Sequence, residues 1–335
     1  MRIFSLQKPH LIFLLYLLLL EVGTRISSSQ SINDNPYATD GPVYSIAFHN
    51  NTIYIGGLFS QLGPATGSAA LIDTATGKPD LSFPKVRGTV YAIAPDASGG
   101  CYIGGYFTHV DGVARNKIAH IKSDKTLDKD WNPNTNGGIR VLIVSDSMVF
   151  ACGEFTSIGG AARNFVAALD ASTGKATDWN PNPNSHVNAL TISGSVVYAG
   201  GNFTSIGDST RSKIAAIDIT TGKATSWNPN ASSGAEVKTF AVSGSTVYVG
   251  GHFTSAGGAP RNNIAALDAS TGKATDWNPN ASYSVNGLVV AGPIIYAVGL
   301  FDSIGGSARR GIAALDASTG NATSNVIHCL KTSLM

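Results

Sequence analysis

The strongest constraint on the fold is a motif that recurs at a nearly fixed spacing. In its clearest copy, residues 197–207 (VYAGGNFTSIG), a short apolar segment leads into two glycines, one variable residue, a phenylalanine and a polar turn. The steps between successive copies of the phenylalanine are 48, 48, 48, 50 and 48 residues. The six phenylalanines are Phe59, Phe107, Phe155, Phe203, Phe253 and Phe301. A period of this length is typical of a repeat architecture, so the chain is expected to fold from copies of one structural unit.

Each copy is predicted to form four short antiparallel strands. In the third copy, residues 139–144 and 148–151 are apolar strands joined by a tight turn, and residues 164–169 form the third strand. The turn Asp170–Gly174 leads to a short fourth strand over about 175–179. Four strands per copy, in six copies, predict an all-β, six-bladed β-propeller whose four-stranded blades cover one another's apolar faces.

Aromatic side chains are predicted to pack between the blades. Besides the six phenylalanines, all four tryptophans occupy one repeat position, and each large ring buries roughly 150–250 Å². The first copy has Phe83 at this position, and spacing places Asn325 there in the sixth, where the tail leaves the repeat. The four tryptophans are Trp131, Trp179, Trp227 and Trp277.

The ends of the chain differ from the repeats. In residues 1–29, Arg2 and Lys8 precede a run of 10 apolar residues (LIFLLYLLLL), which predicts a cleaved signal peptide and a secreted or cell-surface protein. An uncleaved membrane anchor is the alternative. We expect a lead segment at 30–42, a propeller at 43–327 and a divergent tail at 328–335. Either residues 31–35 or a degraded strand at 321–328 is expected to close the ring.

Composition excludes some classes of partner. The formal net charge is only +2, which does not favour binding to nucleic acid or to an anionic membrane. The three cysteines lie at non-equivalent repeat positions, so they are expected to be small buried residues rather than a disulfide framework. A monomer is expected.

The repeat resembles a known family. The pattern G-G-x-F-T-S-I-G-G-x-x-R-N-x-I-A-A-L-D-x-x-T-G, continued to W-N-P-N and seen nearly letter for letter at 251–280, resembles the delta-60 repeat propellers. That resemblance implies an extracellular propeller without an assigned function. The segment 247–251 is similar to kelch repeats, and 170–179 to the tryptophan-docking motif of pyrroloquinoline quinone enzymes. In those enzymes the tryptophan follows the glycine one residue sooner and there are eight blades, so quinone chemistry is not implied.

The predicted ligand face is formed by the loops between strands 2 and 3 and by the connections between blades, because these are the long loops. One position on this face, just before each repeat phenylalanine, changes from copy to copy. This position could determine specificity, although an exposed strand end under little constraint is the favoured interpretation. Its occupants are Leu58, Tyr106, Glu154, Asn202, His252 and Leu300.

A recurrent arginine starts the third strand of five copies. Guanidinium groups at one level could bind carboxylates or sulfated sugars, or they could pair with the acid before each tryptophan (Asp130, Asp178, Asp276). Arg211 and Arg309 lack such an acid and are therefore the candidates for ligand binding. The full set is Arg115, Arg163, Arg211, Arg261 and Arg309.

The sequence contains no familiar catalytic motif: no His-Glu-x-x-His, no nucleophile elbow, no phosphate-binding glycine loop and no paired cysteines at zinc spacing. No metal or cofactor is predicted, and the recurrent aspartate after strand 3 is explained by an Asx-turn rather than by calcium. A non-catalytic binding or scaffold module with a glycan or protein ligand is favoured. The alternatives are a propeller enzyme (quinone-dependent oxidoreductase, glycan lyase or hydrolase), which predicts converging non-repeating titratable residues, and a surface adhesin fragment.

Overall fold

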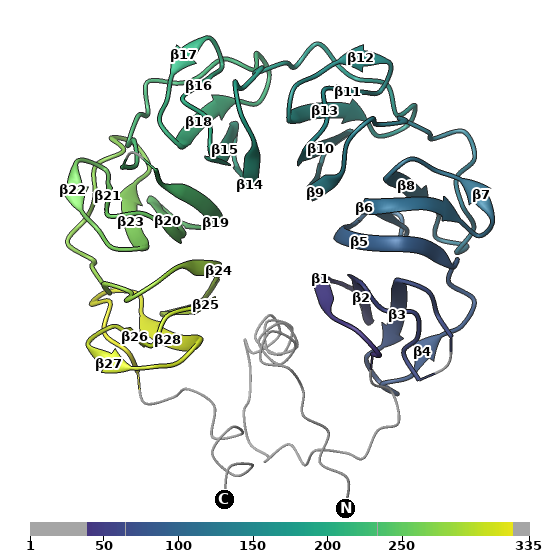
Figure 1. Ribbon diagram of the computed structural model, residues 1–335, viewed down its shortest axis with the longest axis horizontal. Helices are drawn as coiled ribbons and strands as arrows, with labels where there is room; N and C mark the ends of the chain where they lie inside the picture. The colour runs from purple at the N-terminus through teal and green to yellow at the C-terminus, as the bar shows by residue number, and fades with distance from the viewer. Residues whose placement is uncertain (1–38, 64, 233, 324–335) are drawn as a thin grey trace, which may run out of the picture. The chain divides into compact units, whose positions relative to one another are not determined.

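The computed structural model describes residues 39–63, 65–232 and 234–323. The chain divides into two compact units, unit 1 (Met1–His186) and unit 2 (Val187–Met335), with the division between the third and fourth repeats. All regular secondary structure in the described residues is β (Figure 1), and none of it is a helix able to span a lipid bilayer. The predicted signal peptide, the ring-closing residues 31–35, Asn325 and the tail lie outside these residues.

Unit 1 contains three antiparallel sheets that follow the repeats. In each sheet strand 2 lies between strands 1 and 3, as expected of a meander. The first sheet consists of β1 (Val43–His49), β2 (Thr52–Gly57), β3 (Ala69–Asp73) and β4 (Pro79–Asp80). The second consists of β5 (Val86–Pro95), β6 (Cys101–Val110), β7 (Val113–Ala114) and β8 (Ile118–Ile121). The third consists of β9 (Ile139–Ser145), β10 (Met148–Gly153) and β13 (Val166–Asp170). Between β10 and β13 in the chain, β11 (Ser157–Ile158) and β12 (Ala161–Ala162) form a separate hairpin.

Unit 2 repeats this arrangement three times. Its main sheets are β14 (Val187–Ser193), β15 (Val196–Gly201) and β18 (Ile214–Asp218); β19 (Glu236–Ser243), β20 (Thr246–His252) and β23 (Ile264–Asp268); and β24 (Val285–Ala291), β25 (Ile294–Gly299) and β28 (Ile312–Asp316). Its small hairpins are β16 (Ser205–Ile206) with β17 (Ser209–Thr210), β21 (Ser255–Ala256) with β22 (Ala259–Pro260), and β26 (Ser303–Ile304) with β27 (Ser307–Ala308).

The predicted fourth strand is mostly absent from the described residues. In the third copy, the expected strand at 175–179 is reduced to one bridge between Leu169 and Ala176, and most later copies have the same single bridge. The chain is held there by the preceding loop instead, because the Ala176 N–H donates to the carbonyl of Gly159 at 2.9 Å. Strand 3 also starts later than predicted, at Val166, since Phe165 has a left-handed φ of 61° that ends the extended chain.

The glycine pair of the motif lies opposite a β-bulge in strand 1. In unit 2, a Cβ on the second glycine, Gly251, would lie 2.1 Å from the carbonyl oxygen of Glu236 in its own sheet. A Cβ on Gly250 would lie 2.8 Å from a methyl of Val285 in the next sheet. Gly251 therefore leaves room for the bulged strand of its own sheet, and Gly250 leaves room for the neighbouring sheet.

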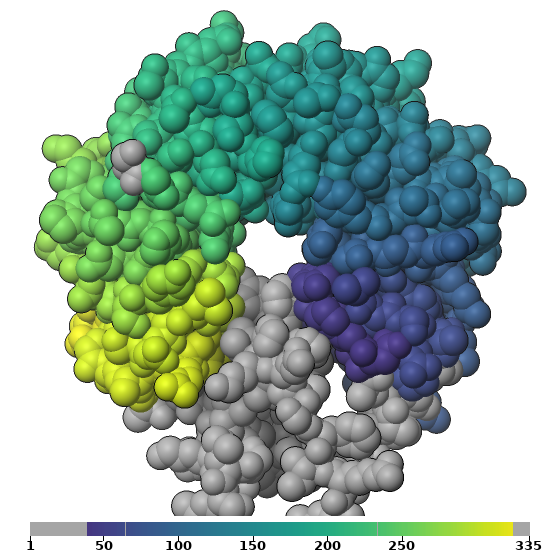
Figure 2. Space-filling model, in the orientation of Figure 1, coloured from purple at the N-terminus to yellow at the C-terminus, as the bar shows by residue number. Residues whose placement is uncertain are grey.

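Neighbouring sheets within a unit pack through their first strands and through the repeat aromatics. In unit 1, β1 lies beside β5 and β5 beside β9, and side chains fill the space between the first (purple) and second (blue) sheets in Figure 2. All six repeat phenylalanines and all four tryptophans are buried. The indole N–H groups of Trp131, Trp227 and Trp277 also donate to a carbonyl in the turn after strand 3 of the next sheet, at 3.2, 2.9 and 3.0 Å.

Candidate functional site

The candidate site in unit 1 combines the bulge of strand 1 with the position before the repeat phenylalanine. The pairing of strands 1 and 2 skips one residue opposite the glycine pair in each sheet, and these skipped residues are Tyr44, Tyr91 and Arg140. A bulge turns a side chain away from the regular ladder. With Tyr106 and Glu154, which precede the phenylalanines, they form a group that we name the Tyr–Arg–Glu patch.

The centre of the Tyr–Arg–Glu patch is the Glu154 carboxylate. Its Oε1 accepts hydrogen bonds from Arg140, with the Arg140 Nε at 3.0 Å, and its Oε2 accepts one from the Tyr106 hydroxyl. Aromatic contacts continue the group: the Arg140 guanidinium carbon lies 5.6 Å from the ring centroid of Tyr91. Tyr91 in turn meets Tyr106 edge-on at 5.9 Å and Tyr44 at 5.1 Å. Side chains from three consecutive sheets therefore converge on one surface.

The patch is charged but balanced. The hydrogen bond from Tyr106 and the ion pair with Arg140 lower the pKa of Glu154, so this carboxyl is ionised at neutral pH. The same bond to Glu154 raises the pKa of Tyr106, which therefore stays a hydrogen-bond donor. Arg140 is 44% exposed and Glu154 29%. A ligand can thus reach both partners without removing a buried charge from its counterion.

Exposed apolar side chains gather at the position that the sequence singled out. Six large hydrophobic residues are exposed in the described part of the chain, and three of them directly precede a repeat phenylalanine. Leu58 is 52% exposed, Tyr106 40% and Leu300 62%. Surface hydrophobics scattered singly need no explanation, but recurrence at one repeat position marks a surface available for contact.

Unit 2 has a related polar group that also includes bulge residues. Glu236 accepts a hydrogen bond from Asn188 at 3.1 Å and pairs with Lys238 at 3.4 Å, and Asn188 and Lys238 are again bulge residues. The predicted residue His252 is exposed and its ring contacts that of Tyr283 at 5.2 Å. Asn202 is partly exposed, and its carbonyl accepts a hydrogen bond from Lys213 at 2.8 Å.

The recurrent arginines donate to backbone carbonyls, and the predicted pairing with Asp130, Asp178 and Asp276 is wrong. Arg211 donates to the carbonyls of Thr210, at 2.8 Å, and Thr225. Arg309 makes the equivalent bond to the carbonyl of Thr323 at 3.2 Å, and the other three arginines bind carbonyls in the same way. Because the fourth strand is reduced to a single bridge, these guanidinium groups provide the donors that a ladder would have supplied.

Sequence reasoning missed the bulge residues. The bulge position varies in chemistry among the six copies as strongly as the position before the phenylalanine, and that variation was the signal that could have revealed it. Its occupants are Tyr44, Tyr91, Arg140, Asn188, Lys238 and Asn286.

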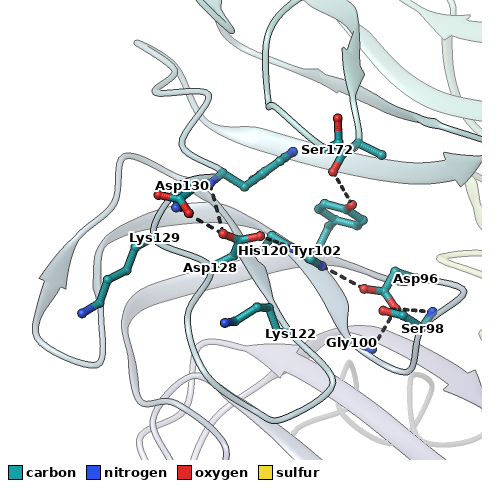
Figure 3. Close-up of polar contacts among 12 residues, drawn as sticks. Asp96, Ser98, Gly100, Tyr102, His120, Lys122, Asp128, Lys129, Asp130 and Ser172 are labelled. Carbon is teal, nitrogen blue, oxygen red and sulfur yellow. Dashed lines mark hydrogen bonds and ion pairs between the residues drawn. The ribbon is translucent and has the colours of Figure 1, made fainter.

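A second group of non-repeating polar residues lies in the second sheet of unit 1. Figure 3 shows His120 between two carboxylates, with the Tyr102 ring beside it. The His120 Nε2 lies 2.8 Å from Asp96 Oδ2, its Nδ1 lies 2.9 Å from Asp128 Oδ2, and its ring stacks on Tyr102 at 4.3 Å. At the equivalent place the third copy has Ala168, which pairs with strand 2 in the same register.

This His120 group is a structural clamp. Burial opposes ionisation of Asp96 and Asp128, but the hydrogen bonds from His120 lower the pKa of both carboxyls. Side-chain exposure is 12% for His120 and 10% for Asp96. Since both ring nitrogens already face carboxylates, neither is available to move a proton or to bind a metal. The described residues hold no group of three or more potential ligands that could hold a metal ion.

The repeated antiparallel sheets, their glycine pairs and their inter-sheet aromatics define a repeat protein of the β-propeller class. The sequence matches the PQQ_2 family, described as outer membrane protein assembly factor BamB, over residues 20–274 and 142–323. The chain belongs to this family. No curated protein sequence is significantly similar to it.

Two solved structures show the same fold at low identity, and a third is reported with them. The computationally designed Ika8 protein is 17% identical, with a TM-score of 0.54 over 84% of this chain and 73% of that one. The WD40 β-propeller domain of Doa1 is 11% identical, with a TM-score of 0.54 over 85% of this chain and 82% of that one. BamB from Moraxella catarrhalis is 14% identical, with a TM-score of 0.45 over 89% of this chain and 74% of that one.

Proposed function

We propose that this protein is a non-catalytic binding or scaffold module whose ligand face is formed by the loops between strands 2 and 3 and the connections between blades. The observation that carries the proposal is the exposure of Leu58, Tyr106 and Leu300 at one repeat position. A rigid propeller repeat holds this position at the same place in every blade. The side chain can therefore change without altering the scaffold.

The favoured partner is a protein segment. Tyrosine and arginine dominate the energetics of protein interfaces, and the Tyr–Arg–Glu patch provides three tyrosines and one arginine around a neutralised carboxylate. The balance of charge disfavours a purely electrostatic partner such as nucleic acid. The name of the matched family, an outer membrane protein assembly factor, supports a protein partner as well. A glycan partner is the competing outcome of the test below.

The repeat and the matched family also support a proposed setting for this face. We propose that the repeats are of the delta-60 type and form one closed six-bladed propeller over 43–327. We also propose that residues 1–29 direct the chain out of the cytoplasm, where the mature protein acts as a monomer at or outside the cell envelope. Arrival of a cleaved product that begins near residue 30 in the exported fraction would support this setting.

A glycan-acting enzyme is the second candidate, because Tyr106, Arg140 and Glu154 are converging, non-repeating titratable residues. Glycoside hydrolysis ordinarily requires two carboxyl groups, one of them protonated. The patch contains one carboxylate, and its pKa is lowered rather than raised. These features favour binding over catalysis. Turnover of a polysaccharide that is abolished in a Glu154→Gln variant would instead establish the enzyme.

The proposal is tested by site-specific photo-cross-linking in the intact exported protein. A photoreactive residue at position 106 should capture a defined protein, whereas the same residue at position 75, exposed in the turn between strands 3 and 4, should not. Equal capture from both positions would overturn the proposal. A glycan array with residues 30–335 identifies a carbohydrate ligand, and a strong hit that Tyr106→Ala removes would replace the protein partner.

A further inference from the structure

A second site lies between the first and second sheets of unit 1, away from the Tyr–Arg–Glu patch. A cavity of about 330 Å³ opens there beside the turns that join strands 1 and 2 and strands 3 and 4. Tyr54, Leu71 and Phe83 of the first sheet line it, facing Gly99, Lys122 and Ser123 of the second. All of these residues belong to unit 1.

The cavity lies where this junction lacks an indole ring. At the next junction of unit 1, Trp131 occupies the repeat position and its indole N–H donates to the Asp170 carbonyl at 3.2 Å. The two junctions of unit 2 repeat this bond with Trp227 and Trp277. Phe83 stands at that position here, and a phenyl ring is smaller and has no N–H group.

The Lys122 carbonyl, which corresponds to the Asp170 carbonyl, therefore accepts one hydrogen bond fewer. The Asp170 carbonyl accepts both the Gly174 N–H, at 2.9 Å, and the indole N–H. The equivalent carbonyl, that of Lys122, accepts the Lys125 N–H at 2.8 Å and no side-chain donor within the described residues. A carbonyl oxygen has two lone pairs, so one remains for a ligand at a residue that lines the cavity.

A second backbone acceptor is released in the same way. Tyr102 donates its hydroxyl to the Ala171 carbonyl at 3.0 Å, across the junction. Its counterpart Tyr54 donates instead to Gly99 at 3.2 Å, in the turn between strands 1 and 2 of the second sheet. The Ser123 carbonyl, equivalent to that of Ala171, therefore receives no tyrosine within the described residues.

The His120 clamp fixes the wall of this cavity. Asp96 opens the turn that carries Gly99 and Gly100, and its Oδ1 accepts the N–H groups of Ser98 and Gly100 at 2.8 and 2.7 Å. Its Oδ2 faces His120 (Figure 3). A turn held from both carboxylate oxygens cannot easily collapse into the space beside it. The cavity is thus a preformed one, as small-molecule sites usually are.

Charge at the rim is balanced. Lys122 and Lys125 lie opposite Asp73 and Asp80, and Lys125 is paired with Asp80. Despite burial, the bonds from Lys125 and Ser82 lower the pKa of Asp80 to about 2, so it is ionised at neutral pH. Two cations and two anions favour a neutral or zwitterionic ligand over one with net charge.

We propose that this cavity binds a small indole, neutral or zwitterionic, whose ring occupies the place of the absent tryptophan. The ring stacks against the apolar floor of Tyr54, Leu71 and Phe83, and its N–H donates to the Lys122 carbonyl. The site is independent of the protein-binding face, since no residue is shared between them.

Indole is the probe, and ¹⁵N-labelled protein reports where it binds. Titration should shift the amide resonances of Gly99, Gly100 and Lys122 together, with one dissociation constant. Benzofuran has nearly the same shape without the N–H, and it should bind about fivefold more weakly through loss of one hydrogen bond. No shift at these amides, or equal affinity for the two rings, would overturn the proposal.

Two variants complete the test. Phe83→Trp places the chain's own indole in the cavity, so it should raise the thermal midpoint and abolish indole binding. Phe83→Leu keeps the cavity open, and it should retain binding to within about threefold even if stability falls. Unchanged indole binding in a folded Phe83→Trp variant would contradict the proposed position of the indole ring. Cross-linking at position 106 should be unaffected in both variants.

Discussion

The Tyr–Arg–Glu patch and the His120 clamp are built from similar parts and differ in exposure. Each joins carboxylates to cationic or neutral donors, and the residue types in each do not recur from copy to copy. In the patch, Arg140 is 44% exposed, whereas His120 is 12% exposed with a carboxylate on either side. An exposed pair can exchange one partner for a ligand at little cost, but a buried group that loses a partner leaves an uncompensated charge. The comparison therefore distinguishes an exposed group that can bind a ligand from a buried group that stabilises the fold.

The largest expected effect is on the clamp. His120→Ala restores the residue that the third copy has, but it removes the donor to the buried Oδ2 atoms of Asp96 and Asp128. We expect the free energy of unfolding to fall by about 3 kcal/mol in urea denaturation. Replacing Asp128 with Thr in the same chain, as at the equivalent Thr177, should recover part of the loss. Unchanged stability in His120→Ala would show that the clamp is not structural.

Acid should reveal the same clamp. The folded-state pKa values of Asp96 and Asp128 are lowered, so their stabilisation is complete above the unfolded value near 4 and is lost as pH falls through the folded values. Unfolding free energy should therefore decline between about pH 5 and pH 2. The turn aspartates such as Asp170, with a pKa of about 2, contribute with the same sign. An Asp96→Asn variant should show a shallower decline, and an identical slope would contradict this assignment.

The arginines provide an intermediate effect that distinguishes structure from binding. Arg211→Ala removes donors from the carbonyls of Thr210 and Thr225, which should cost about 1–2 kcal/mol of stability. Affinity for the cross-linked partner should stay within about twofold. A large loss of affinity with unchanged stability would restore Arg211 as a ligand-binding residue.

In the Tyr–Arg–Glu patch, a substitution should lower partner affinity more than stability. Glu154→Gln breaks a partly exposed ion pair, so stability should change by no more than about 1 kcal/mol. Partner affinity should fall about tenfold, because Tyr106 and Arg140 lose their common acceptor and their fixed orientation. Matched denaturation and affinity measurements on the same preparation separate the two quantities. A stability loss as large as that of His120→Ala would erase the difference between the two groups.

Periodicity predicted the parts of the molecule that repeat. The three main strands of each copy, the glycine pairs and the buried aromatics follow from a pattern seen six times. The fourth strand could not be predicted in this way, because a single bridge such as Leu169 to Ala176 leaves almost the same sequence pattern as a short strand. The partner of Arg163 was missed for the same reason, since it is a backbone carbonyl that becomes available only when the ladder ends.

Contacts between copies were the harder part of the site to foresee. Tyr106 and Glu154 were both singled out because their position varies, and they are 48 residues apart, one period of the repeat. Their joint partner Arg140 lies on a bulge, and bulge register depends on how strands 1 and 2 pair rather than on any one residue. The His120 clamp combines a strand position with two turn residues, and no periodic pattern brings those together.

The most direct test of the central claim compares two exposed residues of the first sheet. Leu58 precedes a repeat phenylalanine and is 52% exposed, whereas Ala75 is exposed in the turn between strands 3 and 4, outside the proposed ligand face. Replacing either with aspartate should change stability by less than about 0.5 kcal/mol, since neither is buried. We predict that Leu58→Asp lowers affinity for the partner captured at position 106 by tenfold or more, as is typical of an interface anchor at about 1.4 kcal/mol per decade. Ala75→Asp should leave that affinity unchanged, and equal affinities for the two variants would contradict the assignment of the ligand face.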